Sequence, residues 1–120
     1  MRITFCLASL LLVSAMGCSQ PRSPQTVSPG SLIRHGAPLV DVRTTREYQV
    51  GHVQGSTNLP IDELERRIGD VAPDKKAPVL VHCQSGGRSA TATQKLQSMG
   101  YKNVVDLGSL ANARKVVEEQ

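Results

Sequence analysis

The sequence predicts an α/β domain in which a small, mostly parallel sheet is flanked by helices on both faces. Short apolar runs alternate with helix-like segments, and the strongest run, Val79–Val81, lies between a proline and a glycine-containing loop. Such alternation is typical of parallel strands joined by helical crossovers. Ligands of these sheets bind beyond the carboxyl ends of the strands. Residues that directly follow a strand are therefore the candidates for function.

Each expected element follows from its residue types. The strands are short runs rich in Val, Leu and Ile, expected at 38–42, 56–59, 79–81 and 103–107. The helices have polar or proline starts and apolar residues one turn apart, expected at 29–35, 44–49, 63–68, 89–99 and 111–119. Ser28 with Pro29 predicts the first helix start, and Asp62 with Glu65 predicts a variant capping box for the third, which Gly69 should end.

The first 17 residues predict an export signal. Arg2 precedes an apolar run over 5–15, which is shorter than the roughly 20 residues of a permanent membrane helix. The sequence AMGC, ending at Cys18, resembles a bacterial lipoprotein signal, in which cleavage precedes a lipidated cysteine. Ordinary cleavage that releases a soluble protein is the alternative. Ser19 favours the outer membrane, so we expect a lipid-anchored protein of the cell envelope that faces the periplasm.

Residues 18–30 are rich in Ser, Pro and Gln and predict a flexible tether, which leaves 31–120 as the globular domain. The formal net charge is +4, but the basic residues are scattered and only 2% of the residues are aromatic. Nucleic-acid binding is therefore not expected. A mild positive field attracts small anions instead.

Cys83 is the candidate catalytic residue. It follows the Val79–Val81 run and precedes a predicted helix, whose N-terminal amides favour a thiolate. Of the other two cysteines, Cys6 leaves with the signal and Cys18 is the predicted lipidation site, so Cys83 has no disulfide partner.

The residues after Cys83 predict an anion-binding loop. Gly86 and Gly87 allow the backbone to curl so that successive N–H groups point inward. Arg88 can donate to an oxyanion in a forked geometry, and Ser89 is expected to be the N-cap of the next helix. No CxxC motif is present, and His82 should point away from its neighbour Cys83, so neither a disulfide reductase nor a metal site is expected.

Two motifs together resemble the single-domain rhodanese family of sulfurtransferases. LVDVRTTREYQVGHVQGSTNLP is similar to the family's D-V-R…E…G-H-x-x-G-x-x-N-x-P signature. VLVHCQSGGRSATATQKLQSMGYKNVVDL is similar to its strand–C-x-x-G-x-R-S–helix pattern. The sequence departs from the family at 108–113, where a tryptophan is often found.

The resemblance implies a mechanism. The Cys83 thiolate takes the outer sulfur of thiosulfate or a related donor and becomes a persulfide, which cyanide or a thiol then discharges. The implied persulfide-binding loop consists of Gln84, Ser85, Gly86, Gly87, Arg88 and Ser89. No metal or organic cofactor is implied. Asp41 and Arg43 are assigned supporting roles beside the loop, and Arg43 is expected to form an ion pair with Glu47.

Other functions of such a loop stay open. A periplasmic persulfide carrier or a thiol-redox factor could use the same Cys83. Non-catalytic binding modules also occur in this family, although they commonly lack the cysteine. A phosphatase is disfavoured because four residues separate Cys83 from Arg88 where phosphatases have five, and arsenate reductases need a further cysteine or a thiol partner.

Overall fold

The computed structural model describes Gly17 and residues 26–120. The elements alternate along the chain, and their bounds are α1 (Pro29–Arg34), β1 (Leu39–Asp41), α2 (Thr45–Val50), β2 (Thr57–Asn58), α3 (Leu64–Val71), β3 (Val79–His82), α4 (Gly87–Ser98), β4 (Val104–Gly108) and α5 (Leu110–Glu118). The predicted signal, Cys18, Ser19 and most of the predicted tether lie outside the described residues. No helix in the described part is long and apolar enough to cross a membrane.

The four strands form one parallel sheet in the order β2-β1-β3-β4. Central strand β3 is buried along its whole length, and its register places Leu80 beside Leu39 of β1 and beside Val105 of β4. Because every strand runs in the same direction, the carboxyl ends of β1 and β3 meet at one edge of the sheet. The predicted α/β class with a parallel sheet is confirmed.

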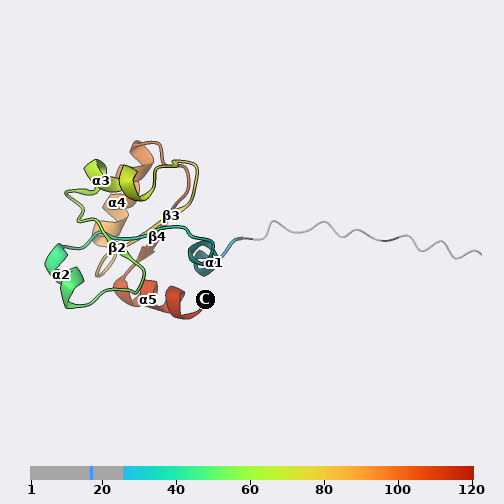
Figure 1. Cartoon of the computed structure of the whole chain (residues 1–120), viewed down its shortest axis with the longest axis horizontal. Helices are drawn as coiled ribbons and strands as arrows, with labels where there is room; N and C mark the ends of the chain where they lie inside the picture. Colours follow the sequence, from blue (N-terminus) through green and yellow to red (C-terminus); the bar gives the residue numbers. More distant parts are fainter. Residues whose placement is uncertain (1–16, 18–25) are drawn as a thin grey trace, which may run out of the picture.

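Helices cover both faces of the sheet, with α3 and α4 on one side and α1 and α5 on the other (Figure 1). Successive strand side chains point to opposite faces, and β3 shows this directly. Val79, Val81 and Cys83 belong to the apolar cluster under α3 and α4, whereas Leu80 belongs to the cluster under α1 and α5. Truncating a fully buried residue such as Leu80 to Ala typically costs about 2–5 kcal/mol.

The helix starts agree only in part with the sequence-based expectations. Ser28 caps α1 by accepting the N–H of Ser31, as predicted, so this helix begins before the expected domain boundary at residue 31. The expected capping box at Asp62 is wrong: Glu63 is the N-cap of α3 and makes no side-chain capping bond. This helix also continues past Gly69 to Val71, because Val71 and Ala72 pack on the core together with Ile68.

Candidate active site

Cys83 lies directly after β3, at the edge where the carboxyl ends of the strands meet. Its N–H donates to the carbonyl of Gly108 at the end of β4, at 2.9 Å, which fixes the start of the loop to the sheet. Its side chain is 1% exposed, and Sγ accepts a hydrogen bond from the N–H of Gly86 at 3.0 Å. The sulfur is therefore enclosed by the loop that follows it.

Gly86 shapes this loop. Its φ of +109° lies in the left-handed region, where a side chain would be strained, and it is the residue that precedes α4. The prediction that Ser89 is the N-cap is wrong, because α4 already begins at Gly87. Ser89 is instead buried in the first turn, and its hydroxyl donates to the carbonyl of Gly86 at 3.0 Å. This bond holds the turn that points the Gly86 amide at the sulfur.

The environment of Cys83 favours the thiolate. Burial opposes ionisation and acts to raise the pKa of the thiol, but hydrogen bonding outweighs it, so the pKa lies below its ordinary value of 9.0. The lowering comes from the backbone N–H groups of Ser89, Gly86 and Ser85. These N–H groups belong to the first turn of α4 and to the loop before it. N–H groups at the start of a helix have no hydrogen-bond acceptor within the helix, so they are free to stabilise an anionic sulfur.

Arg88 is held by a carboxylate of α2. Its guanidinium donates through Nη1 and Nη2 to the two oxygens of Glu47, at 2.7 and 2.9 Å. The Glu47 carboxylate also accepts from the N–H and hydroxyl of Thr44, so the pKa of Glu47 is strongly lowered, chiefly by Arg88. The structure therefore places Arg88 in a forked bond to a protein carboxylate, where the sequence predicted a free donor for an oxyanion.

Arg43 has a different partner from the predicted one. Asp41 accepts from the N–H, Nε and Nη2 of Arg43, and Asp41 and Arg43 are 0% and 3% exposed. The expected Arg43–Glu47 ion pair is thus wrong. Arg43 also donates to the carbonyl of Gly51 and to the side chain of Gln84, at 2.8 and 3.2 Å. It therefore links the end of β1 to the first residue after the cysteine.

The turn between β4 and α5 covers the other side of the loop. The carbonyl of Gln84 accepts from the N–H of Leu110, and Ser85 pairs with Ser109 in an isolated antiparallel bridge. This is the stretch where the sequence departs from the family pattern. Gly108 and Ser109 were missed as neighbours of the site, because only the sheet order brings them there. Gln84, Ser85 and Gly87 are exposed.

His82 is the last residue of β3 and is completely buried. Its Nδ1 lies 3.1 Å from the carbonyl of Cys83, and its Nε2 lies 3.7 Å from a carboxylate oxygen of Asp41 without a hydrogen-bond partner. Burial lowers the pKa of this imidazole below 6.5. Burial therefore disfavours the charged form of His82 beneath the loop. Within residues 26–120 no group of three potential metal ligands comes together.

The fold and this loop define a class of protein: a three-layer α/β domain with a cysteine enclosed by a backbone loop at the carboxyl edge of its parallel sheet. The family model described as "Rhodanese-like domain" matches residues 30–112. The chain belongs to the rhodanese family, so the predicted family and enzyme class are confirmed.

Similar proteins include enzymes. The chain is 42% identical over 71 residues to thiosulfate sulfurtransferase PspE of Escherichia coli K12, covering 59% of this chain and 68% of that protein. It is 36% identical over 76 residues to the thiosulfate:glutathione sulfurtransferase of Saccharomyces cerevisiae, covering 54% and 55%. Among solved structures, a rhodanese with anions from E. coli has a TM-score of 0.61 at 39% identity, covering 63% of this chain and 89% of that one. The human single-domain sulfurtransferase TSTD1 has a TM-score of 0.59 at 28% identity, covering 75% and 89%.

Proposed function

We propose that this protein is a sulfurtransferase that moves a sulfane sulfur from thiosulfate or a related donor to a thiophilic acceptor through a persulfide on Cys83. The observation that carries the proposal is the hydrogen bond from the Gly86 amide to Sγ. It belongs to a tight loop of four residues between Cys83 and Arg88. The names of the relatives support the same reaction class.

The proposed reaction has two covalent steps. The Cys83 thiolate attacks the outer sulfur of thiosulfate, the sulfur–sulfur bond of the donor breaks, and sulfite leaves with the electron pair. The acceptor then attacks the outer sulfur of the persulfide and returns the electron pair to Sγ of Cys83. The amides that lower the pKa of the thiol supply hydrogen bonds to the anionic sulfur in both states.

An activity assay tests this function. The wild type should release thiocyanate from thiosulfate and cyanide, and Cys83→Ser should show no release, because a hydroxyl cannot form the persulfide. An aryl phosphate serves as the control substrate, which neither form should hydrolyse. Thiocyanate release that survives in Cys83→Ser, or hydrolysis of the aryl phosphate by the wild type, would contradict the proposal.

We also propose that Cys18 is lipidated and holds the domain at the periplasmic side of a bacterial envelope membrane. The support is the AMGC sequence and the following Ser19. Labelled fatty acid should be incorporated into the full-length chain and not into Cys18→Ser. Equal labelling of the two forms, or no labelling of either, would count against the anchor.

A further inference from the structure

A cleft lies beside the cysteine loop, between α2 and Gln84. It has a volume of about 290 Å³, and its walls are formed by Arg43, Thr44, Arg46, Glu47, Val50 and Gln84. Gln84 directly follows Cys83, so the cleft lies next to the loop that encloses the nucleophile. Its volume is near the lower end for sites that bind small organic ligands, so there is room for more than a sulfur anion.

The cleft has one cation that is not engaged in an ion pair. The cleft wall has two other charged side chains, Arg43 and Glu47. Arg43 forms an ion pair with buried Asp41, and Glu47 forms one with Arg88 of the cysteine loop. Arg46 is exposed and forms no ion pair with any residue in the described range 26–120. The net charge on the cleft wall is therefore positive and is located at Arg46.

An exposed aliphatic side chain lies next to this cation. Val50 is 86% exposed, an unusual state for a large apolar residue in this domain. Arg46 and Val50 are four residues apart on α2, so they share one face of the helix about one turn apart. This face therefore carries a positive charge beside a small apolar surface.

We propose that the Arg46–Val50 face of α2 selects acceptor thiols that carry a carboxylate on a short aliphatic chain. The inference rests on the proposed sulfur transfer and names the acceptor class for that site. Arg46 attracts the carboxylate, and Val50 contacts the aliphatic chain. Arg46 is thus a specificity-determining residue and takes no part in bond making.

The transfer to such an acceptor is balanced without a further reactant. The acceptor thiolate attacks the outer sulfur of the Cys83 persulfide, and a new sulfur–sulfur bond forms on the acceptor. The bond between Sγ and the outer sulfur breaks, and its electron pair remains on Sγ as the thiolate. The acceptor leaves as a persulfide, so no external oxidant or reductant is consumed.

Two thiols that differ in charge test the inference. The full-length protein is assayed with thiosulfate and either 3-mercaptopropionate or the neutral 2-mercaptoethanol. Arg46→Ala should raise KM for 3-mercaptopropionate roughly three- to fivefold, the size of one exposed ion pair. Its kcat and its KM for 2-mercaptoethanol should stay unchanged, and Arg46→Lys should keep most of the preference.

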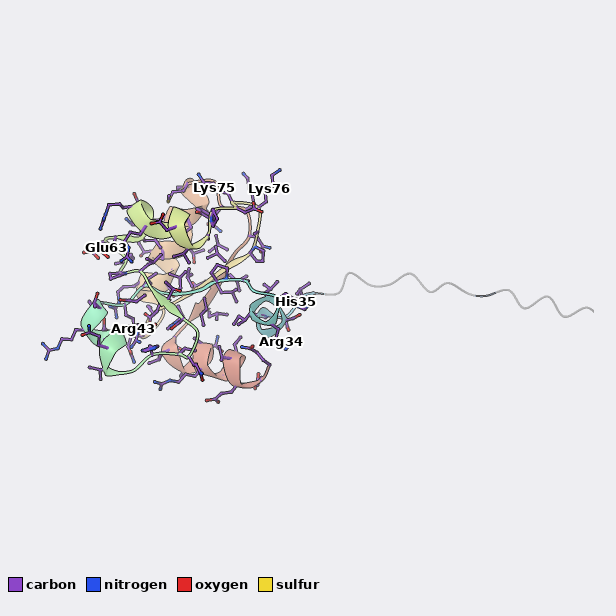
Figure 2. The ribbon with its side chains drawn as sticks, viewed as in Figure 1. Arg34, His35, Arg43, Glu63, Lys75 and Lys76 are labelled. Carbon is purple, nitrogen blue, oxygen red and sulfur yellow. The ribbon has the colours of Figure 1, made fainter. Side chains whose placement is uncertain are left out.

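Arg34→Ala is the matched control, because it removes the same charge from an exposed helical position. Arg34 lies on α1, and Figure 2 shows it on the opposite side of the domain from Arg43 of the cleft wall. It should alter neither KM. An equal change for both thiols in Arg46→Ala, no change for either, or an equal effect of Arg34→Ala would overturn the inference.

Sulfur loading separates this inference from the proposed function. The mass of the wild type after thiosulfate treatment reports the persulfide before any acceptor is added. Loading without carboxylate discrimination would overturn the acceptor class and leave the sulfurtransferase intact. A failure of Cys83 to load under these conditions would overturn both. Slower loading in Arg46→Ala, as large as its effect on KM, would assign Arg46 to the donor and overturn the proposal as well.

Discussion

Two arginine–carboxylate pairs flank the cysteine loop, and they differ in how far water reaches them. Asp41 and Arg43, at the end of β1, are almost completely buried, whereas Glu47 and Arg88 are about one-third exposed. A buried pair is costly to break because the remaining charge is left without solvent. A solvated pair contributes little to stability. The first pair therefore maintains the fold beneath the site, and the second adjusts the electrostatics at its opening.

The largest effect is expected from breaking the buried pair. Arg43→Met leaves the Asp41 carboxylate buried without its partner, which should lower the free energy of unfolding by about 3–5 kcal/mol. Urea unfolding measures this change. The double variant Asp41→Leu/Arg43→Met removes both charges and should be more stable than the single variant. A single variant that loses under 1 kcal/mol would show that the pair is not buried as described.

The next effect is a loss of stability at acid pH. Burial lowers the pKa of His82 below 6.5, so the unfolded chain binds more protons than the folded one as the pH falls. The free energy of unfolding should be at its maximum above pH 6.5 and should decrease from there towards pH 5. The slope should be flatter in His82→Asn and unchanged in His35→Gln, which alters an exposed imidazole. A wild-type slope of zero in this range would contradict the prediction.

Breaking the Glu47–Arg88 pair, which is about one-third exposed, should change the chemistry of Cys83 more than the stability of the fold. Glu47→Gln keeps an oxygen that can accept from Thr44 but removes the negative charge beside Arg88. The free energy of unfolding should fall by at most about 1 kcal/mol. Because Arg88 is then no longer neutralised, the pKa of Cys83 should decrease further. The pH dependence of Cys83 alkylation by iodoacetamide reports this pKa, and an upward shift would refute the electrostatic role.

The smallest effect is expected at the most exposed of three pairs, Arg66 and Glu63. Nη2 of Arg66 on α3 lies 3.3 Å from Oε1 of Glu63, the N-cap of that helix, and Arg66 is 72% exposed. Arg66→Ala should therefore change the free energy of unfolding by less than about 0.5 kcal/mol. Its alkylation profile should match that of the wild type. A larger loss of stability would mean that burial does not rank these three pairs.

The fold was largely predictable because the strands are short apolar runs that contrast with the polar, glycine and proline residues around them. Apolar runs such as Val79–Val81 and the helix signals around them predicted every element except the end of α3 to within two residues, and Ser28 predicted the start of α1. The errors lie where a polar side chain has a choice of local partners. Asp62 could have capped α3, but Glu63 occupies that position.

The charged partners of the site were not predictable from spacing. Glu47 was the expected partner of Arg43, but its carboxylate completes a capping box with Thr44 and reaches Arg88, 41 positions away. The T-x-x-E pattern at 44–47 would have indicated the capping box. The contacts of Arg88 and of Ser109 depend on the sheet order, which brings distant segments to one edge and leaves no local signal.

The central claim is that an enclosed, amide-stabilised Cys83 thiolate accepts one sulfur atom. Mass spectrometry of the protein after incubation with thiosulfate tests it most directly. The peptide that contains Cys83 should gain the mass of one sulfur atom; cyanide should reverse this gain, and Cys83→Ser should not show it. An unchanged mass in a sample whose Cys83 thiol is shown to be reduced and open to alkylation would contradict it.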